Sequence, residues 1–327
     1  MSSSPDQRSK PDLSFLTDAG INVTYNAPLA QFTTFKLGGP CKAMVECANA
    51  GHMTVAVLAL RSLNIPFIVM GFGSNILASD NGVDVVIVRY TNNTPIIRQE
   101  GNTLIVDAAT QLDALAEYAI NAGLTGMTEF SGIPGTVGGA IAGNAGAYGA
   151  QISTPLINLT LLKPDNSVVT VSPDTLHFEY RDSAIKHCND IILSATFTLS
   201  PGDTATMRAK RVETINTRET KHGRWQDTPC AGSFFRNVEP TSKADRRQAA
   251  GGIIEMAGAR NLKIGGAHSY KNHANIITRD NGATAKDVFD LTKRIVEIVN
   301  QRSGINLVRE VRLLGTFDGM GDAKNFW

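Results

Sequence analysis

Residues 130–150 read Phe-Ser-Gly-Ile-Pro-Gly-Thr-Val-Gly-Gly-Ala-Ile-Ala-Gly-Asn-Ala-Gly-Ala-Tyr-Gly-Ala, and the rest of the chain is organised around them. Seven of these residues are glycine, and no charged residue occurs between Glu129 and Lys163. Glycine permits positive φ and lets another molecule approach the backbone closely. Each glycine also costs a helix about 0.8–1.0 kcal/mol relative to alanine. The stretch therefore argues against an ordinary helix and predicts a backbone laid against a flat, uncharged or phosphate-bearing ligand.

Two other interpretations of this stretch stay open. Gly135, Gly139 and Gly143 have the GxxxG spacing of packed membrane helices. Against a membrane span, Pro134 and several polar residues interrupt the run, and few large apolar residues are present to drive insertion. The second alternative is a structural glycine loop that binds no ligand.

A second glycine-rich loop, Gly71-Phe-Gly-Ser-Asn-Ile-Leu77, follows an apolar run at 66–70. Its two glycines free the backbone, so that its N–H groups, serine hydroxyl and asparagine amide could face a pyrophosphate. The third glycine of a dinucleotide motif is absent, because Ile76 stands there, and the Gly-Lys-Ser/Thr of a Walker A loop is absent too. A tight turn between two strands is the alternative.

Length, composition and charge limit the class of protein. The chain has 327 residues, 42% of them apolar, which suffices for two or three domains with proper cores. A net charge of +1 gives no basic surplus that would favour nucleic acid or an anionic membrane. Four cysteines without a CxxC pair indicate reduced thiols in a cytosolic protein: Cys41, Cys47, Cys188 and Cys230. The N-terminus lacks the apolar segment of a secretory signal, and we expect residues 1–28 to form a disordered or frayed tail.

Elsewhere the apolar pattern predicts a mixture of helices and strands. Helices are expected at 53–63, 112–122, 202–222 and 284–300, and strands at 66–70, 84–89, 156–162, 168–171, 191–199 and 307–317, with a strand entry at 32–39 and a hairpin at 95–108. The first helix would place four apolar residues near one face, namely Val55, Leu58, Ala59 and Leu63. In the last helix, Thr284 with Asp287 approximates a capping box.

Three polar segments have plain structural explanations when each is taken alone. Residues 178–183, Phe-Glu-Tyr-Arg-Asp-Ser, could be a surface turn, and residues 229–237 could be a strand entry after a turn. Glu310 and Arg312 would lie on the same face of the last strand, so a surface ion pair is the simplest account of that carboxylate.

In this order, however, the segments resemble the UDP-N-acetylenolpyruvoylglucosamine reductase family, flavoenzymes that make UDP-N-acetylmuramate for peptidoglycan. Eight matching segments are spread over residues 33–316, nearly the whole length of the chain: 34–39, 71–75, 132–139, 143–146, 180–183, 232–237, 273–275 and Glu310. The family has a longer type with an extra tyrosine-bearing loop between the catalytic arginine and serine. Only 52 positions separate Arg181 from Ser233, which predicts the second, shorter type.

The resemblance implies an α+β fold with an FAD-binding domain of the vanillyl-alcohol-oxidase (PCMH) type and a C-terminal substrate-binding domain. The domain boundaries expected from it are a tail at 1–28, the FAD-binding domain at 29–201 with subdomains at about 29–91 and 92–201, a linking helix at 202–222, the substrate-binding domain at 223–318 and a tail at 319–327.

The resemblance also implies FAD as cofactor and NADPH as reducing co-substrate. The residues expected to hold FAD are Gly71, Phe72, Gly73, Ser74, Asn75, Ile76, Gly135, Thr136, Val137, Gly138, Gly139, Asn144, Ala145 and Gly146. Related oxidases often attach FAD through a histidine in the first glycine loop. That loop contains no histidine here, so we expect FAD to be bound non-covalently.

Three residues match the catalytic residues of the family. The resemblance makes Arg181 the cation that stabilises developing charge on the substrate, Ser233 the proton donor, and Glu310 the residue that orients or polarises the substrate. Four more are expected to bind substrate, namely Tyr180, Arg236, Asn237 and His273. The family usually has lysine at the position of Arg236 and serine at that of Cys230. No metal site is expected.

The implied activity is NADPH-dependent reduction of the enolpyruvyl ether of UDP-N-acetylglucosamine enolpyruvate, by a cytoplasmic enzyme. The expected partner is a small nucleotide-sugar substrate, with no nucleic acid and no membrane insertion, and the sequence does not determine the oligomeric state. Two alternatives are another oxidoreductase of the same flavin fold and a non-catalytic nucleotide-sugar binding protein.

Overall fold

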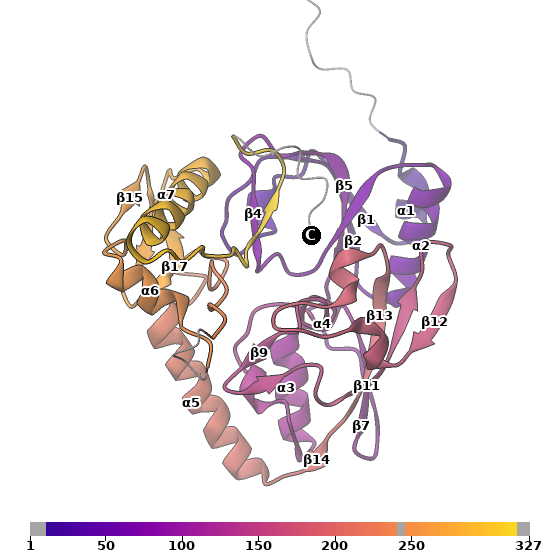
Figure 1. Ribbon diagram of the computed structural model, residues 1–327. Coiled ribbons are helices and arrows are strands. Elements are labelled where there is room, and N and C mark those ends of the chain that lie inside the picture. Colours follow the sequence, from indigo (N-terminus) through magenta and orange to yellow (C-terminus); the bar gives the residue numbers. More distant parts are fainter. Residues whose placement is uncertain (1–10, 241–245, 319–327) are drawn as a thin grey trace, which may run out of the picture.

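The computed structural model describes residues 11–240 and 246–318. Its first part begins with a four-stranded sheet in which three neighbouring strands are parallel and one edge strand is antiparallel (Figure 1). The strands in order across the sheet are β1 (Asn22–Tyr25), β2 (Cys41–Cys47), β5 (Val83–Tyr90) and β3 (Phe67–Met70), accompanied by helices α1 (Ser14–Asp18) and α2 (Ala50–Ser62).

The expected tail at 1–28 is wrong for its described part. Residues 11–28 contain α1 and β1, and Leu13, Leu16 and Ile21 are buried in the core. Burying such side chains gains about 1.5–3 kcal/mol each, enough to hold the segment in place. Residues 1–10, and the predicted tail at 319–327, lie outside the described residues.

The second sheet of the first part is antiparallel and has five strands. Across the sheet these are β12 (Val168–Val171), β11 (Leu156–Leu162), β13 (Ile191–Thr198), β7 (Thr103–Asp107) and β6 (Ile97–Glu100). They confirm the predicted hairpin and the three predicted strands that follow it. Helix α3 (Leu112–Asn121) is also confirmed, and Gly123 follows it with φ of 71°.

The glycine-rich stretch does contain a helix, contrary to expectation. Helix α4 (Val137–Ala142) is only six residues long, and the side chain of Thr136 caps it by accepting a hydrogen bond from the N–H of Gly139. Its buried residues are packed against the five-stranded sheet, so tertiary burial offsets the poor helix propensity of two glycines.

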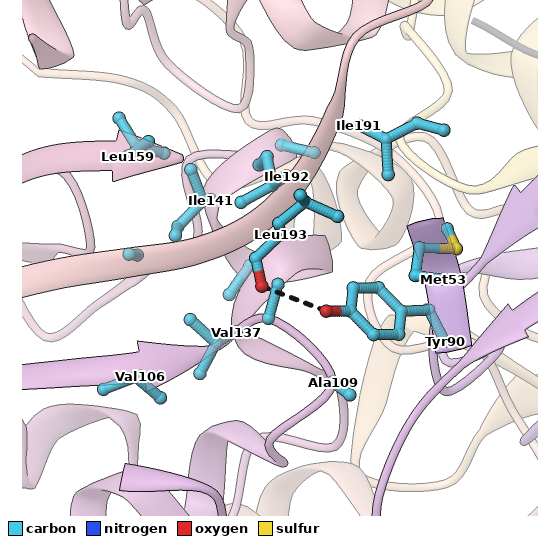
Figure 2. Close-up of a cluster of buried hydrophobic side chains, with 14 of the residues drawn as sticks. Met53, Tyr90, Val106, Ala109, Val137, Ile141, Leu159, Ile191, Ile192 and Leu193 are labelled. Atoms are coloured by element: carbon cyan, nitrogen blue, oxygen red, sulfur yellow. Dashed lines mark hydrogen bonds between the residues drawn. The ribbon is translucent and has the colours of Figure 1, made fainter. Parts of the chain in front are cut away.

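One hydrophobic core cluster contains buried residues of both sheets, and Figure 2 shows part of it. The hydroxyl of Tyr90 in β5 lies 3.0 Å from Leu193 O and 2.9 Å from Asp107 Oδ1. The same cluster includes Met53, Val106, Val137, Ile141 and Ile192. The apolar face predicted for α2 is wrong, because Val55 and Leu63 are exposed and the buried residues are Met53, Ala56, Val57 and Leu60.

Helix α5 (Thr204–His222) leads from the first part to the C-terminal part, and it confirms the helix predicted at 202–222 (Figure 1). The C-terminal part contains α6 (Ala250–Met256), α7 (Ala285–Ser303) and a three-stranded antiparallel sheet that the sequence did not predict. This sheet consists of β15 (Lys263–Ile264), β16 (Ala267–Tyr270) and β17 (His273–Arg279). The predicted capping box of α7 is confirmed.

The chain returns to the first part at its end, where β18 (Arg312–Leu314) pairs in parallel with β4 (Ile76–Ala78) (Figure 1). The strand predicted at 307–317 is therefore much shorter than expected, because the backbone bonds between residues 307–311 and the segment 234–236 do not form a regular ladder. The predicted strand entry at 32–39 is a series of turns before β2. The remaining short pairs are β8 (Leu124–Thr125) with β14 (Ser200–Pro201) and β9 (Gly146–Ala147) with β10 (Ala150–Gln151).

Candidate active site

The two glycine-rich loops lie against each other. A Cβ added to Gly71 would be 2.6 Å from Thr136 Oγ1, and one added to Gly135 would be 3.4 Å from Ser74 Oγ. Any larger residue at the first position would push the loops apart. The chain thus brings together, through its tertiary structure, two backbone segments that are both predicted to face a phosphate-bearing ligand.

The glycines of these loops serve different purposes. Gly73 has φ of 76°, and a Cβ there would run into the carbonyl oxygen of Phe32. At Gly138 a Cβ would lie 3.1 Å from the Cβ of Ala108. Gly143 differs, because its φ is ordinary and the nearest atom to an added Cβ is Gly139 O, at 3.4 Å. The protein itself therefore does not require glycine at 143.

In the part of the chain that the structure describes, three buried polar atoms in or next to the glycine stretch have no hydrogen-bond partner, namely Thr128 Oγ1, Ser131 Oγ and Asn144 Oδ1. An unsatisfied buried polar atom costs about 1–3 kcal/mol, so such atoms usually have a partner. Exposed loop backbone and unpartnered hydroxyl and amide oxygens fit a large polar group such as FAD. Asn144 itself is held by its amide nitrogen, which donates to Glu179 O at 2.8 Å.

Asn75 was expected to face a pyrophosphate, but its amide bonds within the protein. Its side-chain Nδ2 donates to Glu310 O at 3.2 Å, and its backbone carbonyl accepts from the N–H of Arg312 at 3.0 Å. This residue consequently ties the first glycine loop to the chain segment that carries the candidate catalytic carboxylate.

Arg181 lies at the corner of a tight turn. Glu179 and Asp182 exchange both backbone hydrogen bonds, at 3.1 and 3.3 Å, and Arg181 has φ of 58°. A left-handed conformation costs a residue with a side chain about 1–2 kcal/mol. The guanidinium reaches two partners: Nη2 donates to Gly146 O at 2.8 Å, and Nε lies 3.1 Å from Glu310 Oε1. That Nε is not aligned for a hydrogen bond, so the contact with Glu310 is an ion pair.

Glu310 therefore pairs with Arg181, and its alternative as half of a surface pair with Arg312 is wrong. Burial raises the pKa of the Glu310 carboxyl, while the charges of Arg181, Lys186 and Arg236 act in the opposite direction. Burial thus favours the neutral carboxyl and the three cations favour the carboxylate, and opposing influences of this kind are common on groups at functional sites.

Ser233 lies in a segment that forms backbone hydrogen bonds with two other parts of the chain, one at Asn275 and one at Glu310. On one side Phe234 donates its N–H to Asn275 O at 2.8 Å, and on the other Phe234 O accepts from the N–H of Glu310, also at 2.8 Å. The side chain of Asn275 adds two bonds to the backbone of Phe235. Phe234, which directly follows Ser233 in the chain, is thereby bonded to the backbone of the residue that carries the candidate carboxylate.

The four residues expected to bind substrate have different surroundings. The ring of Tyr180 contacts two cations, with the guanidinium carbon of Arg181 5.5 Å and that of Arg247 4.1 Å from the ring centroid. Arg236 has a buried Nε without a hydrogen-bond partner among the described residues. The side chain of Asn237 accepts from the N–H of Ala250 at 3.2 Å, so part of it is used within the protein.

His273 packs edge to face on His222, with ring centroids 5.3 Å apart. Burial lowers the pKa of both histidines, that of His222 to about 4. Both rings are therefore neutral at physiological pH, and His273 can accept or donate a hydrogen bond without carrying charge.

The sequence-based prediction missed two residues at the site. The first is Lys186, whose charge, like that of the predicted Arg236, lowers the pKa of Glu310. The second is Arg218 of α5, which donates to Ser131 O and Glu129 O, both at 2.9 Å, and thus connects the linking helix to the glycine stretch. The hint that the sequence offers is the position of Lys186, shortly after the polar segment 178–183 that contains Arg181.

Within residues 11–240 and 246–318, no group of three or more histidine, cysteine, aspartate or glutamate side chains could hold a metal ion. In the same residues no helix combines the length and apolar character needed to cross a membrane.

Comparisons with known proteins bear on this geometry. A family model for an FAD binding domain matches residues 41–172, and the model for the C-terminal domain of UDP-N-acetylenolpyruvoylglucosamine reductase matches residues 224–314. These matches confirm the predicted fold class, an FAD-binding domain followed by a C-terminal domain.

Curated relatives and a solved structure agree with the family models. UDP-N-acetylenolpyruvoylglucosamine reductase of Lactobacillus gasseri is 33% identical over 307 residues, which covers 94% of this chain and 98% of that protein. The protein of the same name from Streptococcus uberis is 33% identical over 306 residues, with the same coverage. The crystal structure of UDP-N-acetylenolpyruvylglucosamine reductase (MurB) from Thermus caldophilus matches with a TM-score of 0.72 at 27% identity, covering 90% of this chain and 98% of that one.

Proposed function

Since the chain belongs to the UDP-N-acetylenolpyruvoylglucosamine reductase family, we propose that it reduces UDP-N-acetylglucosamine enolpyruvate to UDP-N-acetylmuramate with NADPH as reductant. The observation that carries this proposal is the pairing of Arg181 with Glu310, beside the Ser233 segment. A cation, a hydroxyl and a carboxyl are the groups this reduction needs. The reaction supplies a precursor of peptidoglycan, and we place the enzyme in the cytoplasm, where nucleotide sugars and NADPH are available.

FAD, when bound, would supply the redox chemistry by taking two electrons from NADPH and passing them to the enolpyruvyl double bond. The backbone of the two glycine loops would hold it without a covalent bond, with the unpartnered Thr128, Ser131 and Asn144 oxygens available to its polar groups. The FAD-binding residues proposed from the sequence remain the basis of this site. Asn75 acts within it by connecting the loop to Glu310.

Arg181 would stabilise the negative charge that develops at C2 of the enolpyruvyl group and spreads into its carboxylate. A fixed cation in a partly water-excluded site is worth far more than one in water. The side chain of Arg181 is mostly shielded, at 25% exposure, and its turn is fixed before substrate arrives.

Ser233 would then give its hydroxyl proton to C2, so that one hydrogen is added at each end of the double bond. Serine is a weak acid, so the transfer needs a strongly basic carbon at hydrogen-bond distance. Glu310 would orient the substrate beside it. Tyr180, Arg236, Asn237 and His273 would bind the rest of the nucleotide sugar. In this proposal residues 29–201 form the FAD-binding domain and residues 223–318 form the substrate-binding domain. The helix at 202–222 connects the two domains.

The experiment that tests the function separates the two half-reactions. Under anaerobic conditions, NADPH should bleach the yellow protein, and UDP-N-acetylglucosamine enolpyruvate should restore the colour. Acid precipitation should release the flavin into the supernatant. A colourless protein that FAD cannot reconstitute would instead favour a binding protein, and bleaching without recovery of colour would favour another oxidoreductase.

A further inference from the structure

A buried lysine, Lys186, bonds to the turn that carries Arg181 and has no part in the proposed mechanism. Lys186 follows the polar segment 178–183, yet only 6% of it is exposed. Its ammonium donates a hydrogen bond to the backbone carbonyl of Arg181, the residue with the left-handed φ of 58°. A lysine is almost never this buried unless its charge has a partner.

The other contacts of Lys186 lie in the same turn. Its Nζ is 3.8 Å from Asp182 Oδ1, and its N–H donates to Ser183 O at 3.0 Å. Ser183 in turn donates its hydroxyl to Ala142 O at 2.8 Å, which attaches the turn to the end of α4. The lysine side chain therefore bonds directly to the strained peptide of Arg181.

We propose that Lys186 is a positioning residue, which holds the Arg181 peptide in its left-handed conformation and so keeps the guanidinium between Gly146 and Glu310. The inference rests on the proposed function of Arg181. A charged donor makes a stronger hydrogen bond to a carbonyl than a neutral donor does. A carbonyl held by such a bond resists rotation of its peptide group. Lys186 touches no reacting atom in this scheme and acts through Arg181.

The charges around Lys186 give the proposal a pH dependence. Burial first, and then the charges of Arg312 and Arg236, lower the pKa of Lys186 to about 8, while Asp182 and Glu310 oppose the shift. Above that pH the ammonium loses its proton and the bond to the Arg181 carbonyl loses its charge assistance. The step that depends on Arg181 should therefore slow as pH rises past about 8.

The test compares Lys186→Met, which keeps the length of the stem, with His187→Ala as a matched control. His187 contacts the same Asp182 carboxylate, at 3.0 Å, but makes no bond to Arg181. In the FAD-loaded protein without substrate, hydrogen exchange at the amides of Glu179 and Asp182 should accelerate in Lys186→Met and stay unchanged in His187→Ala. Unchanged exchange in Lys186→Met overturns the proposal.

The kinetic arm uses the two half-reactions. Bleaching by NADPH should keep its rate in Lys186→Met, and recolouring by the enolpyruvyl substrate should slow about 10-fold to 100-fold, the loss expected for one charged hydrogen bond. On an Arg181→Ala background the same substitution should add almost nothing, since both act through one group. Additive effects, or equal slowing of both half-reactions, overturn the proposal.

Lys186→Gln, which retains a neutral donor, serves as the second variant if Lys186→Met loses its flavin. Loss of fold or flavin in both variants would assign Lys186 to general stability and overturn the proposal. A wild-type protein that bleaches but is not recoloured by the substrate contradicts the proposed function alone. Hydrogen exchange then decides the role of Lys186 by itself.

Discussion

Two residues of the proposed site combine an unusual backbone conformation with an unmet hydrogen bond. Arg181 and Asn144 both have positive φ, and both also carry a buried atom without a hydrogen bond. Strain and unsatisfied polar groups cost stability, so they persist where the surrounding structure fixes them, commonly at functional sites. Both residues were proposed for the site from the sequence, and the structure gives each a physical peculiarity that a plain surface turn does not require.

At Ser233 the two halves of the reaction should separate. Ser233→Ala should bleach with NADPH at nearly the normal rate, because no proton is needed from the protein in that half. Recolouring by the enolpyruvyl substrate should slow about 10²-fold to 10⁴-fold, the usual effect of losing a positioned proton donor. Stopped-flow absorbance of the flavin, recorded separately for each half, measures both rates.

Ser233→Cys is the companion variant, because a thiol can also donate a proton, and it should recover part of the lost rate. If Ser233 only packs between its neighbours, alanine would affect both halves alike or neither. Rapid recolouring of Ser233→Ala would mean that the proton comes from another group.

His222 should make the folded protein sensitive to acid. Its pKa is about 4 when folded, below the ordinary 6.5, so between these values the unfolded chain binds more protons than the folded one. Stability is therefore complete above pH 6.5 and falls as pH decreases toward 4. His222→Asn should flatten this part of the curve, as measured by Tm between pH 7 and pH 4.5.

His177→Asn is a suitable control because His177 is exposed, and its curve should follow that of the wild type. His273 also has a lowered pKa, so some acid sensitivity should remain in His222→Asn. An unchanged curve in His222→Asn would show that the pair of rings does not set the acid limit.

Among the elements, α4 shows why a glycine-rich segment can still be helical. Its two glycines lie where a side chain would meet neighbouring atoms, as at Gly138 against Ala108, and Thr136 supplies the cap. Propensity alone disfavours this helix, but a short capped turn packed on a sheet gains more from burial than it loses. The same glycines leave the outer side of the element open to a ligand.

Gly143→Val should remove FAD without unfolding the protein. The chain leaves room at this position, since an added Cβ meets only Gly139 O, at 3.4 Å, and φ is ordinary. Bulk there would therefore obstruct the cofactor rather than the fold. The flavin-to-protein absorbance ratio measures the loss, and circular dichroism checks that the fold persists.

Gly252→Val is the matched control, because a Cβ on Gly252 of α6 meets nothing within 4 Å and lies outside the proposed cofactor site. It should retain its flavin. Gly138→Val is unsuitable, since it would clash with Ala108 whether or not FAD binds. A folded Gly143→Val protein with full flavin would contradict the proposed contact.

In the molecule as a whole, the first part contributes side chains to the hydrophobic core of the C-terminal part. The C-terminal core includes three side chains from the first part, Phe35, Leu37 and Leu77. Asp80 accepts hydrogen bonds from the first two N–H groups of α7, at 2.9 and 3.0 Å, and β18 pairs with β4. The segment 34–39, matched to the family by sequence, thus has a structural role between the two parts.

We expect residues 223–318 expressed alone to lack a cooperative thermal transition, because their core would expose the surfaces that these three side chains cover. The full chain should unfold in one transition. In the full chain, Leu77→Ala should destabilise by about 2–5 kcal/mol, as usual for a buried leucine. Circular dichroism melts measure all three, and a fragment that melts cooperatively would make the C-terminal part an independent domain.

Much of this protein follows from its sequence alone, wherever the cause is local. The hairpin, the helix before Gly123 and the Thr284–Asp287 capping box depend on neighbouring residues, and the structure has each of them. Motif order also identified the family, because loops that must lack side chains tolerate few substitutes for glycine. The local sequence pattern gave a wrong prediction for the buried face of α2 and for the length of β18, where a few residues decide the result.

Only the tertiary structure decided which distant residues meet. The pairing of Arg181 with Glu310, the bond from Asn75 to Glu310 and the support of Arg181 by Lys186 cannot be read from spacing. Burial likewise decided that residues 11–28 are part of the core. The physical reason is that propensity and hydrogen bonding act over a few residues, whereas ion pairing and burial depend on the path of the whole chain.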